Sequence, residues 1–384
     1  MVIKVRGPAR FFYLEYPNAK IWLLGDRHDS PDETPFASCA DYDVEVADVM
    51  EQVLLRNTDH HRLVFIEAFY SKESFSRIEN QDQAGFLHKI RERFRYCLER
   101  LATAARAARG QPLRGRARPT YRQLVDPSFV ANWNRDLERY QTRCMNHFSL
   151  DDRSNVYAAD YRQGPLRPIA NAISNSTRTT EQVRQACTTL LQFILLHPQR
   201  GIPSIRKVNA ELTNFFQALD CFPDGGRPKS IQILIKMLRN VHRLSMNQRQ
   251  QYFYSVTHHH YHIFNVANVP SNVRRLMYTV ALNDLVSICK VIAACTGPQP
   301  RPVLVMHYMG ASHSYVWYQI LQHVLGHPVM RRVRDAPDRC IEVSDNLWSR
   351  LRLPGRQTRS GTTETSRRHA RLFRLDTTNR WTGI

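Results

Sequence analysis

Two hydrophobic runs near the start of the chain, separated by a short polar turn, predict a β-hairpin. The first run covers residues 10–16 and is rich in aromatic side chains, and the second is Ile21-Trp22-Leu23-Leu24. The turn between them, Pro17-Asn18-Ala19-Lys20, contains residues that favour reversal of the backbone. The second strand ends at Gly25-Asp26-Arg27-His28, so polar and ionisable residues directly follow a buried strand.

The next segments alternate between helical and strand patterns. Residues of about 41–56 place Val44, Ala47 and Val53 at helical spacing, and residues 62–66 form a second buried run that stops at Glu67. The order strand, helix, strand predicts a crossover unit with parallel strands.

The rest of the folded chain is predicted to be mainly helical, with two further strands. A short strand at 155–159 ends in Asp160-Tyr161-Arg162, and a strong strand at 302–309 leads through Gly310-Ala311-Ser312-His313 into a helix from 314 to about 325. Such a strand, glycine turn and helix can present a ligand site. Helical spacing predicts the remaining helices at about 84–108, 180–196, 205–220, 229–243 and 270–294.

These patterns together predict an α/β protein with a mostly parallel central sheet, flanking helices, a large helical insertion and a basic C-terminal tail. We expect one α/β domain over 1–345, with a helix-rich insertion at about 80–255. The tail, 346–384, is predicted to be disordered, because the 38 residues from Leu347 carry nine Arg against one Glu and one Asp and show little periodic hydrophobicity.

Composition agrees with a folded protein and shows a strong positive charge. The 384 residues are 42% hydrophobic and 10% aromatic, which excludes collagen, a coiled coil and a largely disordered chain. The formal net charge is +20, and a basic surface and tail of this kind can attract nucleic acid or an acidic partner without sequence specificity. The arginine-rich segments lack interleaved aromatic residues and any known reader module, so a solvated basic face is the simpler interpretation.

The cysteines and the N-terminus suggest an intracellular setting. The eight cysteines form no close pairs of the kind found in zinc ribbons, and most are expected to be reduced and buried. No continuous apolar run reaches the roughly 18–20 residues that span a bilayer, and the opening residues lack the apolar stretch of a signal peptide. We therefore expect a soluble intracellular protein that is not secreted and has no membrane partner.

Two Gly-x-x-His motifs, almost three hundred residues apart, carry the candidate chemistry. They are Gly25-Asp26-Arg27-His28 and Gly310-Ala311-Ser312-His313, and each follows a buried strand. Glu67 ends the strand at 62–66. Because the carboxyl ends of parallel strands lie along one edge of a sheet, His28, Glu67 and His313 are expected to meet there.

Two kinds of chemistry fit this trio. His28, Glu67 and His313 could hold one divalent metal (Zn, Mn or Co) that activates water, or one histidine could act as a general base while the other stabilises negative charge. Gly25 and Gly310 would supply the tight turns. The expected second-shell or substrate-binding residues are Asp26, Asp29, Asp160 and Arg162.

Other histidines are less convincing candidates. Thr257-His258-His259-His260-Tyr261-His262 could bind a transition metal, but alternate residues of a strand point in opposite directions, so a solvated or half-buried segment is favoured. His307 lies within the strand at 302–309 and is interpreted as a satisfied core histidine.

At these motifs the chain resembles the TraB, TIKI, ChaN and erythromycin-esterase superfamily, which is marked by two Gly-x-x-His motifs and an acidic residue on strand ends of an α/β fold. The resemblance implies that His28, Glu67 and His313 are active-site residues and that Gly25 and Gly310 are turn glycines. The superfamily includes metal-dependent proteases, metal-independent esterases and a haem-binding lipoprotein. The motif Leu-Leu-Gly-Asp-Arg-His-Asp also resembles motifs in uncharacterised proteins of giant DNA viruses.

The sequence therefore predicts a hydrolase of ester or peptide bonds, with or without a divalent metal, acting on a small molecule or peptide. The alternative is a non-catalytic basic protein on the same scaffold that binds nucleic acid or an acidic partner, in the host cytoplasm or in a virion if the chain is viral. Substrate, metal identity, catalytic competence and oligomeric state do not follow from the sequence.

Overall fold

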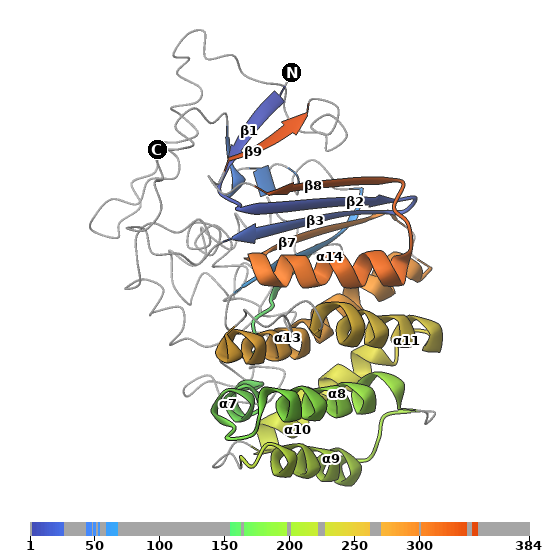
Figure 1. Ribbon diagram of the computed structural model, residues 1–384. Coiled ribbons are helices and arrows are strands. Elements are labelled where there is room, and N and C mark those ends of the chain that lie inside the picture. Colours follow the sequence, from blue (N-terminus) through green and yellow to red (C-terminus); the bar gives the residue numbers. More distant parts are fainter. Residues whose placement is uncertain are drawn as a thin grey trace, which may run out of the picture.

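The computed structural model describes residues 2–26, 44–47, 49–50, 53, 59–67, 154–162, 165–197, 201–221, 227–261, 270–298, 301–335 and 340–344. These residues form a mixed α/β structure with two sheets and a stack of helices (Figure 1). The predicted helix at 84–108 and the predicted tail at 346–384 lie outside the described residues.

The larger sheet has six strands in the order β6-β5-β7-β3-β2-β8. Three neighbouring pairs are parallel (β6 with β5, β5 with β7, and β7 with β3), whereas β2 pairs antiparallel with both β3 and β8. The sheet is therefore mixed. The strands are β2 (Arg10–Tyr16), β3 (Ala19–Asp26), β5 (His61–Ile66), β6 (Ser154–Ala158), β7 (Val303–Gly310) and β8 (Met330–Asp335).

A smaller three-stranded sheet, not anticipated from the sequence, lies beside the first. Its order is β4-β1-β9, with β1 (Val2–Arg6) parallel to β4 (Val44–Glu45) and antiparallel to β9 (Cys340–Ser344). The predicted helix of about 41–56 therefore begins later than expected, because Val44 belongs to β4. The described positions 46, 47, 49, 50 and 53 are helical and their side chains are buried.

The N-terminal hairpin is confirmed, and so is the parallel orientation of β3 and β5. Strands β2 and β3 pair from Arg10 with Gly25 to Tyr16 with Ala19. Strands β3 and β5 are not neighbours, however, since β7 lies between them and pairs with both. This insertion of a late strand brings residues 19–26 and 303–310 together at the centre of the sheet.

Most of the predicted helices are present within a residue or two of the expected bounds. Helices α7 and α11 were not predicted, and the histidine-rich segment is a π-helix rather than a strand. The helices are α7 (Arg167–Asn175), α8 (Thr180–Leu196), α9 (Ile205–Ala218), α10 (Arg227–Val241), α11 (Met246–Tyr254), the π-helix η2 (Ser255–His260), α13 (Ser271–Thr296) and α14 (Ala311–Leu325).

The helices stack in layers beneath one face of the six-stranded sheet (Figure 1). Helix α14 lies directly on the sheet, where Phe12 of β2 stacks on Tyr318 with ring centroids 4.5 Å apart. Helix α13 comes next, and α7 to α10 lie beyond it. One continuous hydrophobic core joins the sheet face to all of these helices, so the helical region and the sheet fold as neighbours in one packed structure.

Helix α13 changes the expectation about membrane-spanning segments. Among the described residues it is the one helix long and apolar enough to cross a bilayer, with a mean hydropathy of 1.5 in its most apolar window. That window is 83% buried inside the protein. Its apolar character is therefore accounted for by its place in the core, as in a soluble protein.

The cysteines of the described region are mostly free, as predicted. Cys187, Cys221, Cys289 and Cys295 are free thiols, and burial raises the pKa of Cys187, Cys289 and Cys295. Cys340 in β9 is different, because it is disulfide-bonded.

Candidate active site

The ends of β3, β5, β6 and β7 meet at one edge of the larger sheet. Asp26, the last residue of β3, pairs with Gly310, the last residue of β7. The Glu67 amide donates to the Tyr308 carbonyl at 3.1 Å, and the Ala159 amide donates to the Ile66 carbonyl at 2.9 Å. The predicted convergence of strand ends is thus confirmed for Asp26, Glu67, Asp160 and Gly310.

The glycine at the end of β3 is required by the packing of α14. A Cβ atom at Gly25 would lie 2.8 Å from the Ala311 Cα and 3.1 Å from the Ser314 Oγ. The first of these neighbours is backbone and cannot rotate away. Gly25 therefore permits a close approach between β3 and the first turn of α14, whereas the sequence predicted a tight turn at this position.

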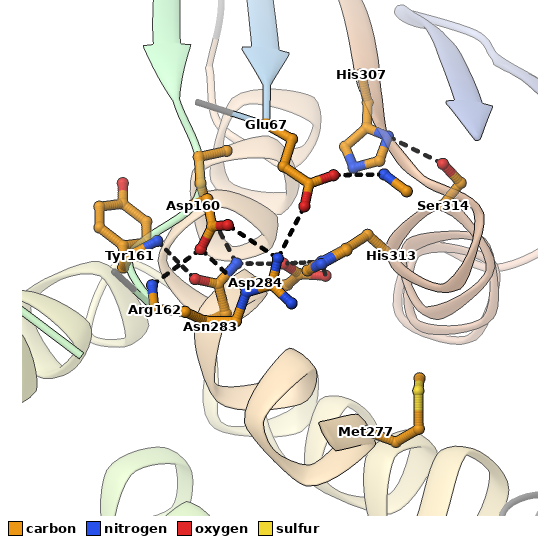
Figure 2. Close-up of polar contacts among 12 residues, drawn as sticks. Glu67, Asp160, Tyr161, Arg162, Met277, Asn283, Asp284, His307, His313 and Ser314 are labelled. Carbon is orange, nitrogen blue, oxygen red and sulfur yellow. Dashed lines mark hydrogen bonds and ion pairs between the residues drawn. The ribbon is translucent and has the colours of Figure 1, made fainter. Parts of the chain in front are cut away.

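Glu67 is held at both carboxylate oxygens. Its Oε1 accepts from the Arg162 Nη2 at 2.8 Å, and its Oε2 accepts from the Gly310 amide at 2.7 Å (Figure 2). The Gly310 amide is at the N-terminal end of α14, where unpaired amides favour a negative charge. These two donors stabilise the buried Glu67 carboxylate and fix its orientation.

Arg162 joins Glu67 to Asp160. Its Nε and Nη2 donate to Asp160 Oδ1 and Oδ2 at 3.1 and 2.8 Å, and the same Nη2 also reaches Glu67. Burial disfavours the charge on Arg162, but the hydrogen bonds and charges of Asp160, Glu67 and Asp284 outweigh it and raise the pKa of the guanidinium above its ordinary value. The expected site residues Asp160 and Arg162 are therefore one buried ion-pair network with Glu67.

His313 forms a buried pair with Asp284 of α13. The His313 Nδ1 lies 2.8 and 2.9 Å from the two Asp284 oxygens, and the side chains are only 4% and 1% exposed. Burial lowers the pKa of His313, but the Asp284 carboxylate, through its charge and its hydrogen bond, and the charge of Glu67 raise it to a value above the ordinary one. Because Nδ1 is hydrogen-bonded to Asp284, Nε2 is the nitrogen available to react. None of the described residues is hydrogen-bonded to this Nε2.

Asn283, the residue before Asp284, ties α13 to the loop after β6. Its side-chain amide donates to the Ala159 carbonyl at 3.2 Å and to Asp284 Oδ1 at 3.0 Å, and its Oδ1 accepts from the Tyr161 amide at 2.7 Å. Figure 2 shows these side chains converging between α13 and the strand ends. This bridge fixes Asp284 relative to Asp160 and Arg162.

His307 is fully buried close to the site. Its Nδ1 lies 3.3 Å from the Ser314 Oγ, and its ring packs on Trp317 with centroids 4.4 Å apart. Burial, and then the charge of His313, lower the pKa of His307 well below the ordinary value, so it is neutral at physiological pH. The Nε2 of His307 has no hydrogen-bond partner among the described residues. The core position expected for His307 is confirmed, and one of its two ring nitrogens has a described partner.

The sequence-predicted residues are only partly brought together by the described structure. Glu67, Asp160, Arg162, Gly310 and His313 form the site, and Asp26 is buried at the end of β3 beside Gly310. His28 and Asp29 lie outside the described residues.

The described residues alone do not fit a metal centre. No group of three or more His, Cys, Asp or Glu side chains in the described ranges is arranged to hold a metal ion. Both oxygens of Glu67 already accept strong donors, one of them a cation. A metal held by His28, Glu67 and His313 would have to compete with Arg162 for the carboxylate, so no catalytic step is derived through a metal.

Asp284 and Asn283 were missed by the sequence analysis. Both lie in the middle of the long apolar helix α13, where a neighbouring amide and carboxylate are fully buried. Buried polar side chains need partners, so this adjacent pair within an apolar helix was a usable signal.

Comparisons of the chain with protein-family models, with curated proteins and with solved structures found no match.

Proposed function

We propose that this protein is a hydrolase of ester or peptide bonds in which His313 is the general base. The observation that carries the proposal is the buried Asp284–His313 pair, with Nδ1 bound to the carboxylate and Nε2 directed away from it. This pairing fixes the tautomer of a neutral imidazole and stabilises the imidazolium formed when Nε2 accepts a proton.

The reaction needs one water and one proton carrier. His313 Nε2 removes a proton from water, and the water oxygen bonds to the carbonyl carbon of the substrate. When the tetrahedral intermediate collapses, the C–O or C–N bond breaks, and the proton on His313 passes to the leaving group.

Arg162 is the candidate for stabilising the oxyanion of that intermediate. Its charge acts on His313, and its side chain is 20% exposed, whereas Glu67 and Asp160 are nearly fully buried. The two carboxylates hold the guanidinium in one orientation, so little reorganisation is required as negative charge develops.

The resemblance to the TraB, TIKI, ChaN and erythromycin-esterase superfamily supports the same proposal. The two Gly-x-x-His motifs begin at neighbouring positions of paired strands, since Gly25 pairs with Met309 and Asp26 with Gly310. His28 follows Asp26 by two residues. We propose that His28 shares the site, either as a second acid–base group or, with Glu67 and His313, as a ligand to Zn, Mn or Co.

The test is a screen of generic ester and peptide substrates with the full chain and matched histidine variants. His313→Ala should lower kcat by roughly 10²–10⁴-fold because it removes the base, while His327→Ala, at an exposed position after α14, should leave kcat unchanged. Elemental analysis of the same samples tests for the metal. An absence of hydrolysis across the screen, or equal effects of the two variants, would contradict the proposal.

A second candidate function, binding of nucleic acid, is favoured by the edge strand β8. Arg331, Arg332 and Arg334 are all exposed on this strand, which ends the order of the larger sheet. Clustered arginines at a sheet edge attract phosphates through counterion release. This function predicts binding that weakens steeply as salt rises.

One set of variants separates the two functions. Replacing the three arginines of β8 with glutamine, or deleting residues 346–384, should reduce retention of a short DNA duplex without changing hydrolysis. If neither change alters DNA retention, the binding function is wrong.

A further inference from the structure

The histidine-rich segment of the sequence is divided by the π-helix into a buried and an exposed part. His260 is 1% exposed, and its Nε2 lies 3.2 Å from the Met277 carbonyl oxygen in the core. His258 and His259 are exposed on the surface. Insertions of π-helix occur frequently at functional sites, and His258 and His259 are the exposed histidines of this one.

A third histidine comes to the same place from α14. His323, in the last turn of α14, is exposed and has its ring centroid 5.6 Å from that of His259. Tyr254, at the end of α11, stacks on His323 at 5.6 Å and on His258 at 4.2 Å, and meets His259 edge-on. We name these four residues the His–Tyr cluster: Tyr254, His258, His259 and His323.

Within this cluster the ring separation of His259 and His323 suits a shared metal ion. Metal–nitrogen bonds of about 2.0–2.1 Å place each ring centroid about 3.2 Å from the ion, and two such centroids then lie about 5–6 Å apart at tetrahedral to trigonal angles. The observed 5.6 Å falls in this range. Neutral imidazole is a good ligand for zinc, copper and nickel.

His258 is arranged differently from its neighbour. Its Nδ1 lies 2.9 Å from the Thr257 Oγ1, and its ring is flat against Tyr254, with an interplanar angle of 15°. These contacts hold the ring against the tyrosine rather than turn it toward His323. His258 therefore provides a matched control in the same turn of helix.

We propose that His259 and His323 bind one divalent transition-metal ion, with water completing its coordination, and that the ion joins η2 to α14. Partial burial and the charge of His259 lower the pKa of His323 from its ordinary value, and a metal binds the neutral form of imidazole. The site is distinct from the candidate active site, because His313 and His323 are ten residues apart on α14, about 15 Å along the helix axis.

The proposal is tested by calorimetric titration of the full chain with Zn²⁺. Wild-type protein should bind one equivalent that is weakened at least tenfold in both His259→Ala and His323→Ala, while His258→Ala should bind within threefold of wild type. The same equivalent should persist in His313→Ala, which separates this site from any metal bound at the candidate active site.

All three positions are exposed, so the variants should fold, and circular dichroism of each variant confirms this before titration. Zinc binding that is unchanged in His259→Ala or in His323→Ala would overturn the proposal. An equal loss in His258→Ala would also overturn it, because the ligand pair would then be wrong.

Discussion

At the scale of single residues, the candidate site is a set of buried charges that depend on one another. Glu67, Asp160 and Asp284 are three carboxylates in a region that is almost closed to water, where Arg162 pairs with the first two and His313 pairs with Asp284. Buried charges of this kind are tolerated only when they are paired and hydrogen-bonded. Removing one partner is therefore expected to change the others.

The Asp284–His313 pair sets the pH dependence of the proposed reaction. A base must be deprotonated to act, so kcat should rise with pH through the His313 pKa, which the structure places above the ordinary value of 6.5. Asp284→Asn removes the negative charge that raises this pKa and leaves only a neutral hydrogen-bond acceptor, while burial, which lowers the pKa, remains. The rising limb of the kcat–pH profile should therefore move to lower pH, with a lower maximum; a limb at unchanged pH would show that His313 is not the base.

Arg162 should be more important for stability than an ordinary surface arginine. Arg162→Ala leaves Glu67 and Asp160 buried without their shared cation, and the free energy of unfolding should fall by about 3–5 kcal/mol. Arg162→Lys keeps the charge but cannot donate to both carboxylates in a fixed fork. The free energy of unfolding should therefore fall less in Arg162→Lys than in Arg162→Ala. Urea denaturation of the three proteins measures the difference; equal stability of Arg162→Ala and wild type would contradict the network.

The buried histidines should make the fold sensitive to acid. Burial lowers the pKa of His260 to about 4 and that of His307 well below 6.5. The unfolded chain therefore binds more protons than the native one as pH falls from about 6.5 to about 4, and stability is lost across that window. His260→Gln removes one of these two buried histidines, so the Tm of the variant should fall measurably less than that of the wild type as the pH is lowered. His327→Ala, at an exposed position, should leave the fall in Tm unchanged.

At the scale of secondary-structure elements, the site depends on how closely β3 approaches α14. A methyl group at Gly25 would meet the Ala311 Cα at 2.8 Å. We expect Gly25→Ala to cost about 1–3 kcal/mol of stability and to lower kcat by displacing His313. Adding Ser314→Gly should not restore either property, because the obstructing atom is backbone; recovery in the double variant would show that the serine side chain was the obstacle.

Sequence patterns predicted the elements that have strong local signals. The hairpin, β5, β6, β7 and the long helices were found from their periodicity, and the strand ends marked Glu67, Asp160 and His313. The patterns could not show that β7 separates β3 from β5, because strand order depends on contacts between distant segments. They also missed η2, since four histidines in five positions have no apolar period. Asp284 was missed although a carboxylate inside an apolar helix signals a buried partner, but the identity of that partner, His313, depends on how α13 packs beside α14.

At the scale of the whole molecule, the small sheet holds the end of the described chain to its beginning, and its last strand carries a disulfide. Strand β9 pairs with β1, and Cys340 at the start of β9 is disulfide-bonded. Cys340→Ser should lower the free energy of unfolding by about 2–4 kcal/mol. A reducing agent should lower the free energy of unfolding of the wild type to that of Cys340→Ser and leave the variant unchanged. If the reducing agent also destabilises the variant, the loss of stability has another cause.

The place of β7 between β3 and β5 also has a consequence for biosynthesis. The ribosome completes β3 and β5 long before β7 emerges, and these two strands must not pair with each other in the meantime. A nascent chain of this topology is therefore exposed to mispairing until its final third is made. It folds late and slowly because its central strands β3 and β7 pair across almost 300 residues of sequence, as Ala19 with Val303 does. Chaperone dependence during expression would be the practical sign of this arrangement.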